Sequence, residues 1–167
     1  VVVDVFYNGT WNVCPCIAAI GHTLGNDVYD TQTTVADLRN ALSITAYEAS
    51  GAYASYSKSD VKIYTDSSKE TELDDTAKLS EYLNGTSGEY ATGNLYIEVT
   101  TTTGLTLGKT TEIKLKKDSI VGITVKPNDG GYKFTYSYNA TSNEGGFALD
   151  RDSYTIMANY ASGAEGT

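Results

Sequence analysis

The chain has 167 residues, of which 40% are hydrophobic and 20% charged, and its 21 acidic groups outnumber 12 basic ones to give a formal net charge of −9. This balance argues against a nucleic-acid-binding protein, whose affinity depends largely on Lys and Arg contacts to phosphate, and against docking on an anionic membrane. The 14 Tyr and 23 Thr favour half-buried strands. With a single His, sites built on several histidines are excluded. Composition therefore predicts a β-rich protein with little catalytic equipment.

The first residues predict a β-hairpin. Val1, Val3 and Val5 lie on one face of an alternating strand, and Asn8-Gly9 is a strong signal for a tight hairpin turn. We expect the return strand to run from Thr10 to about Ala18, with Pro15 marking an edge or a bulge. The valines form either a core strand or a strand that completes the sheet of a neighbouring subunit.

Two cysteines flank Pro15. A disulfide between Cys14 and Cys16 would be strained, because the two side chains of an extended segment stand near the upper limit of separation. Free thiols, a strained redox pair, bonds to neighbouring subunits, or half of a metal site with His22 remain open. Because such a metal site would need a fourth ligand from elsewhere, we expect no metal and no cofactor.

The middle of the chain predicts two helices and two strands. Thr34 followed by Asp37 is a capping signal for a helix from Val35 to about Ala46. The stretch from Glu48 to Ser59 is expected to be a loop or a frayed continuation of that helix. Alternation predicts strands at 61–65 and 95–99. Asp74 and Asp75 precede a short helix that Asn84-Gly85 would close in the left-handed conformation.

This order of elements resembles the ubiquitin-like β-grasp fold. The resemblance rests on the strand from Val61, the acidic stretch Thr71–Thr76, the short helix carrying Leu79, Tyr82 and Leu83, and the strand ending at Val99. It implies a β-grasp module over residues 1–103. No Gly-Gly tail follows Val99, so the conjugation chemistry of ubiquitin does not carry over, and a scaffold does not by itself define a function.

Residues 104–167 predict an all-β antiparallel module, which would be either a small sandwich or barrel or an extension of the first sheet. The fold as a whole is expected to be α+β and mostly β. Strands are expected around Ile113, from Val121 to Val125, from Tyr132 to Tyr138 and from Tyr154 to Tyr160. A turn at 127–131 joins the second and third of these, and the tail at 162–167 is expected to be loose. Half of the basic residues fall between 109 and 133, where a basic face could meet an acidic face of a neighbouring unit.

A search for chemistry identifies no catalytic residues. The pairs Asp74/Asp75 and Asp150/Asp152 lack a partner for acid–base work, so we interpret them as a helix cap and a turn. The Gly-rich stretches carry no phosphate-binding pattern. We therefore do not expect an enzyme.

Tyrosines are the candidate binding residues. Tyr132, Tyr136 and Tyr138 could form a rigid contact surface if they are exposed, or cross-strand packing pairs if they are not. Tyr53 and Tyr56 lie in a Tyr/Ser/Gly/Ala loop whose composition suits recognition. We expect a non-catalytic structural protein of an extracellular, cell or virion surface, which self-assembles or mediates attachment through strand edges and Tyr-rich faces. Its partners would be further copies of the chain or neighbouring structural subunits, without membrane insertion. The alternative is a β-grasp module that binds a protein, a glycan or a small ligand.

Overall fold

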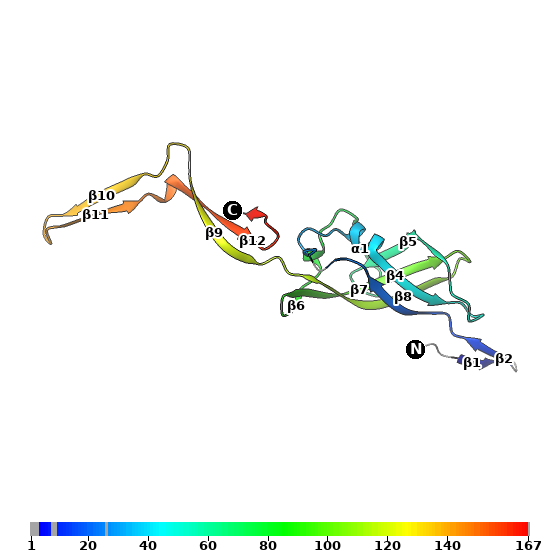
Figure 1. Cartoon of the computed structure of the whole chain (residues 1–167). Helices are drawn as coiled ribbons and strands as arrows, with labels where there is room; N and C mark the ends of the chain where they lie inside the picture. Colours follow the sequence, from blue (N-terminus) through cyan, green and yellow to red (C-terminus); the bar gives the residue numbers. More distant parts are fainter. Residues whose placement is uncertain (1–3, 8–9, 26, 167) are drawn as a thin grey trace. The chain divides into compact units, whose positions relative to one another are not determined.

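The computed structural model describes residues 4–7, 10–25 and 27–166, with the backbone alone for 4–7 and 10–13. The chain is mostly β, with several antiparallel sheets (Figure 1). It divides into two compact units, unit 1 (residues 1–117) and unit 2 (residues 118–167). The boundary follows Lys117 and not Thr103, because the strand that begins at Thr106 pairs along its length with the strand before it.

The N-terminal hairpin is shorter than predicted. Strands β1 (Asp4–Tyr7) and β2 (Thr10–Val13) pair antiparallel, while the predicted Asn8-Gly9 turn lies outside the described residues. The return strand does not continue to Ala18, since a separate strand, β3 (Cys16–His22), pairs with a later strand. Pro15 has no N–H to offer a ladder, which explains the break between β2 and β3.

The predicted helix begins as expected and ends early. Helix α1 (Val35–Ala41) follows a capping box in which the Thr34 hydroxyl accepts from the Asp37 N–H at 3.1 Å and the Asp37 carboxylate accepts from the Thr34 N–H at 2.9 Å. The predicted end near Ala46 is wrong, because β4 (Leu42–Tyr47) starts directly after Ala41. Leu42, Ile44 and Ala46 are buried and the residues between them are not, so every second side chain faces the core, as in a strand and not as in a helix.

The main sheet of unit 1 is built around β7 (Tyr90–Thr101). On one side β7 pairs with β8 (Thr106–Lys116), and on the other with β5 (Tyr56–Tyr64) and β6 (Gly85–Ser87), all antiparallel. The predicted short helix is a single 3-10 turn, η1 (Leu79–Glu81). Gly85 begins β6 and does not end that helix in a left-handed conformation.

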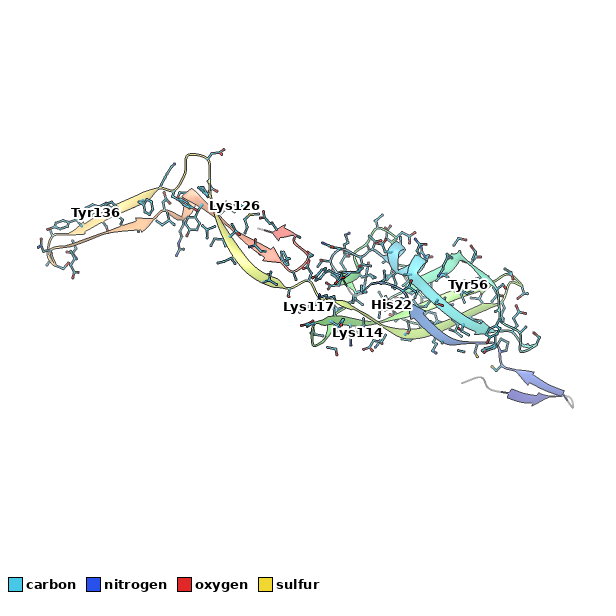
Figure 2. All side chains as sticks on the ribbon, in the orientation of Figure 1. His22, Tyr56, Lys114, Lys117, Lys126 and Tyr136 are labelled. Carbon is cyan, nitrogen blue, oxygen red and sulfur yellow. The ribbon has the colours of Figure 1, made fainter. Side chains whose placement is uncertain are left out.

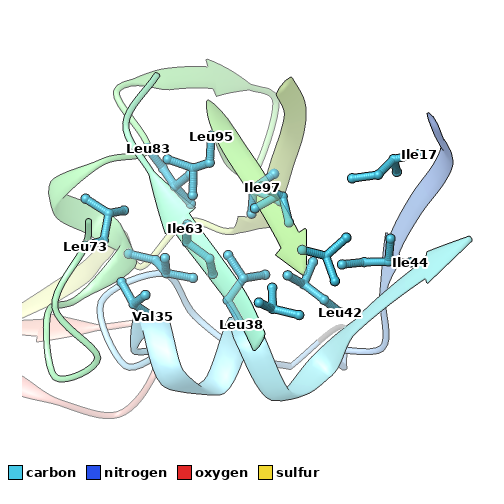
Figure 3. Packing of buried hydrophobic residues seen from close by; sticks show 14 of the residues in the cluster. Ile17, Val35, Leu38, Leu42, Ile44, Ile63, Leu73, Leu83, Leu95 and Ile97 are labelled. Carbon is cyan, nitrogen blue, oxygen red and sulfur yellow. The ribbon is translucent and has the colours of Figure 1, made fainter. Parts of the chain in front are cut away.

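A single hydrophobic core fills unit 1. It combines the inner face of α1 with alternating residues of β4, β5, β7 and β8 (Figure 3). The fully buried side chains include Val35, Leu38, Leu42, Val61, Ile63, Leu79, Leu95, Ile97, Val99 and Ile113. The alternation predicted at 61–65 and 95–99 thus supplies the centre of this core.

Unit 2 contains two small sheets. Strand β9 (Ile120–Pro127) pairs with β12 (Tyr154–Tyr160), and β12 also pairs with β13 (Glu165–Gly166). Strands β10 (Phe134–Asn139) and β11 (Glu144–Leu149) form a separate hairpin, and the 3-10 turn η2 (Arg151–Ser153) follows it. Gly130 and Gly131 have φ angles of 97° and 76°, in agreement with the predicted turn. The tail is not loose as expected, since β13 belongs to the sheet.

Candidate interaction surface

Unit 2 has strands but almost no interior. Among the described residues, every buried hydrophobic side chain lies between Ile17 and Leu115, and Ser153 is the buried residue of unit 2. The large apolar side chains of its strands are exposed instead. Soluble monomers rarely expose large contiguous apolar surface, so this arrangement indicates a surface for contact.

The most apolar part of unit 2 is one face of the β10–β11 hairpin, which we call the aromatic face. Residues directly opposite in an antiparallel pair share a face, and here Phe134 opposes Leu149, Tyr136 opposes Phe147, and Tyr138 opposes Gly145. The aromatic face therefore consists of Phe134, Tyr136, Tyr138, Phe147 and Leu149. Figure 2 shows the side chain of Tyr136 on this hairpin.

Local contacts hold the rings of the aromatic face in place. The rings of Tyr136 and Phe147 form a tilted cross-strand pair with centroids 4.9 Å apart. The Tyr138 hydroxyl donates to Asn143 Oδ1 at 2.5 Å. A Cβ at Gly145 would stand 2.4 Å from Tyr136 Oη, so glycine is required for this ring position. Phe147 nevertheless remains 76% exposed.

The opposite face of the same hairpin is different in character. It carries small or polar residues in the opposed pairs Thr135/Ala148, Ser137/Gly146 and Asn139/Glu144. The loop between the strands is polar as well, and Asn139 Oδ1 accepts from the backbone N–H of Thr141 at 3.0 Å. The hairpin thus has one aromatic face, one face of small residues and a polar tip.

The sheet β13-β12-β9 is also two-sided. Ile123 opposes Ala158 and Val125 opposes Ile156, and Ile123, Val125 and Ile156 are exposed. The other face carries mostly polar side chains beside Met157. Thr124 and Asn159 are hydrogen-bonded across the strands, and Lys126 forms an ion pair with Glu165 at 2.6 Å. Its polar groups therefore find partners within unit 2, while its apolar groups do not find a core there.

The tyrosines predicted for binding fall into two groups. Tyr132, Tyr136 and Tyr138 are about half exposed in unit 2, and the Tyr132 hydroxyl donates to the Val125 carbonyl at 3.1 Å. Tyr53 is 73% exposed and stacks on Tyr47 with centroids 5.0 Å apart. These four side chains present ring surface to solvent.

Tyr56 has a packing role. It begins β5, lies half buried against the core, and its hydroxyl accepts from the Ile44 N–H at 3.0 Å. It thereby ties β5 to β4 and presents little ring surface, so the structure does not bring Tyr56 together with Tyr53 in one exposed binding loop.

The remaining predicted residues are dispersed. Val1 and Val3 lie outside the described residues, and Val5 lies in β1, where the backbone alone is described. Cys14 is exposed, and Cys16 and His22 stand at opposite ends of β3. Six strand steps separate Cys16 from His22 by about 20 Å. That separation is too large for the two to share one metal ion.

The carboxylate pairs serve local structure. Asp74 Oδ1 accepts from the Thr76 hydroxyl at 2.6 Å and from the Thr76 N–H at 2.7 Å, and these bonds lower the pKa of Asp74. Asp75 pairs with Arg39. Asp74 and Asp75 lie in the turn ahead of η1 and do not cap it, since Lys78 is the N-cap residue of η1. Asp150 caps η2 by accepting from the Asp152 N–H.

A polar hollow of about 380 Å³ lies in unit 1 beside β6 and β7. Hydroxyl, amide and carboxylate groups line it, together with the ring of Tyr82. They come from Thr65, Asn84, Thr92, Asn94 and Glu112. No sequence motif predicts this group, because its members come from four separate segments of the chain.

Sequence reasoning also missed half of the aromatic face. Strand β11 was not predicted, so Phe147 and Leu149 were not placed beside the tyrosines. Signals were present: Gly145, Phe147 and Leu149 alternate, and Asn139 and Asn143 suit a turn, with Asn143 adopting a φ of 55°. Two glycines in the strand obscured this pattern, since glycine disfavours strands.

Comparison of the chain with protein-family models, with curated proteins and with solved structures finds no match. Among the described residues, no helix has the length and apolar character needed to cross a membrane.

Proposed function

We propose that the protein is a non-catalytic structural subunit of an extracellular, cell or virion surface, which self-assembles or mediates attachment through the apolar faces and strand edges of unit 2. Unit 1 would serve as the folded scaffold that carries them. The acidic, Tyr- and Thr-rich composition supports the location.

The observation that carries this proposal is the lack of buried hydrophobic side chains among the described residues of unit 2. An isolated two-stranded hairpin is marginally stable in water, and a sheet needs an apolar face covered by another layer. Unit 2 contains such a hairpin and a small sheet with exposed Val and Ile. Covering these faces by another protein surface would supply the missing layer.

The scaffold itself supports a ubiquitin-like β-grasp relationship as a further part of the proposal. The capped helix α1, strand β5, the 3-10 turn η1 and strand β7, which is antiparallel to β5, occur in the order that the resemblance implies, with β4 and β6 inserted between them. The pairing of β3 with β4 across α1 departs from the predicted scheme. A solved structure of unit 1 compared with β-grasp proteins would test this relationship.

Assembly is tested by the size of the full chain in solution. We expect sedimentation velocity over a range of concentrations to show reversible growth beyond a monomer, and electron microscopy of concentrated protein to show regular particles or filaments. A chain that remains monomeric at every accessible concentration would contradict self-assembly. Reductant serves as the control: if Cys14 or Cys16 linked the subunits, reduction would dissolve the assembly.

The polar hollow favours a second candidate function, the binding of a small hydroxylated ligand such as a sugar. Its amide, hydroxyl and carboxylate groups can hydrogen-bond to hydroxyls, and Tyr82 offers a ring for contact. A screen of simple sugars by thermal shift tests it, since a ligand of the native state raises the melting temperature. A response lost in Asn94→Ala and kept in the distant Ser50→Ala would support binding.

A further inference from the structure

We propose that the aromatic face of the β10–β11 hairpin is a self-association surface, on which the same face of a second copy packs. This inference rests on the proposed function and names both the surface and its partner. The two hairpins would stack face to face about a two-fold axis, as two-layer sheets do at a spacing of about 10 Å.

The extent of the aromatic face matches such a contact. An aromatic side chain buries roughly 150–250 Å² when it is covered, and each of the four rings is more than half exposed. The rings of one copy thus leave on the order of 500 Å² to be covered. Two copies together remove about 1,000 Å², which is the area that a specific interface needs.

The charge pattern favours a second copy as the occupant. Each chain carries a net charge of −9, so two copies repel one another over most of their surface. The five residues of the aromatic face are uncharged, and Glu144 lies on the opposite face. Two copies can therefore meet there without burying like charges, which would be costly. Because the same uncharged, apolar face is present on both copies, the contact requires no second kind of surface.

The aromatic face is also ordered before contact. The Tyr136–Phe147 ring pair, the Tyr138–Asn143 hydrogen bond and the close fit over Gly145 restrict the rings in the single chain. Ordering side chains is one of the costs of association, so a face that is already ordered loses less on binding. Tyr and Phe are the residue types that interfaces enrich.

A lipid surface fits the hairpin less well. The tip from Asn139 to Asn143 is polar, and Glu144 follows it. An inserting hairpin would carry this tip into the hydrocarbon first, where unsatisfied polar groups are costly. The net negative charge also opposes approach to anionic headgroups.

The test compares association of the full chain with that of two single variants. We expect Phe147→Ser to weaken self-association at least about tenfold, as the loss of a central aromatic anchor does. Ala148→Ser, on the opposite face of the same strand, should leave it unchanged. If the wild type associates and Phe147→Ser associates equally well, the inference is overturned while the proposed function stands. If the wild type is monomeric, self-assembly fails, and this inference fails with it, while attachment to another protein surface remains as the proposed function.

A second measurement does not depend on the stability of the serine variant. In a Trp11→Phe background, Phe147→Trp keeps an aromatic ring at the face, and its emission should shift to shorter wavelength as concentration rises. Ala148→Trp should not shift. Added salt should strengthen association by screening the repulsion between copies, whereas an interface of opposite charges would weaken. Two results would overturn the inference. One is self-association that weakens when salt is added, and the other is flotation of the chain with neutral vesicles that Phe147→Ser abolishes.

Discussion

The carboxylate of Asp37 closes the first turn of α1 by accepting hydrogen bonds from the Thr34 N–H at 2.9 Å and from the Thr34 hydroxyl at 2.7 Å. These bonds, the backbone bond above all, lower the pKa of Asp37 below its ordinary value of 3.8. A carboxyl with a lowered pKa stabilises the folded state at pH values above its unfolded pKa, and this stabilisation is lost as acid protonates it.

We therefore predict that Asp37→Asn lowers the free energy of unfolding by a few tenths to about 1 kcal/mol at neutral pH. The difference from wild type should shrink as the pH falls below about 4, because the wild-type carboxylate then loses its charge. Urea unfolding at several pH values measures it. Asp60→Asn, at an exposed site in β5 without a side-chain hydrogen bond, is the matched control. A difference that grows in acid would contradict the assignment.

Thr34 and Asp37 could be recognised from the sequence because a capping box is a contact between residues three apart. The exposure of Phe147 could not be predicted in this way. Whether an alternating apolar row faces a core or solvent depends on what the rest of the chain places over it. For Phe147 no described layer of unit 2 does so, and no short sequence pattern carries that information.

At the scale of elements, helix and strand were predicted well where one periodicity ran without interruption. The alternation at Val61–Ile63 and Leu95–Val99 lies inside β5 and β7. The end of α1 was wrong because Leu38 and Leu42 keep a helical spacing, while Leu42, Ile44 and Ala46 equally fit a strand. Pairing of β4 with β3 decides between the two, and the paired residues of β3 lie 20 to 31 positions earlier in the chain.

The contrast between the sheets gives an element-scale prediction. Ile97 in β7 is fully buried, whereas Ile123 in β9 is 67% exposed. Ile97→Val should cost about 0.5–1.5 kcal/mol of unfolding free energy, since it leaves a small cavity. Ile123→Val, the same chemical change, should stay within about 0.5 kcal/mol. Denaturant unfolding is measured at dilutions where the chain is monomeric. Equal costs at the two sites would show that β9 is covered within the single chain.

At the scale of the whole molecule, the two units differ in how they can be stable. Unit 1 contains the whole cluster of buried hydrophobic residues, from Ile17 to Leu115. The predicted division falls after Thr103, where the strand expected at 95–99 ends in a run of threonines. In the structure Gly104 has a φ of 83° and the turn around it joins β7 to β8 within one sheet.

We accordingly predict that a fragment of residues 1–117 folds alone and unfolds in one cooperative transition, because a domain of this size can bury a sufficient core. It should also stay monomeric at concentrations where the full chain associates, since it lacks the aromatic face and the exposed Val and Ile of β9. Urea unfolding followed by circular dichroism and sedimentation velocity measure the two properties. A shorter fragment of residues 1–103 is the control, and it should not fold, because it lacks β8. That strand pairs with β7 along its length and contributes the buried Leu107, Ile113 and Leu115 to the core. If the 1–117 fragment folded and assembled as the full chain does, assembly would have to be assigned to unit 1.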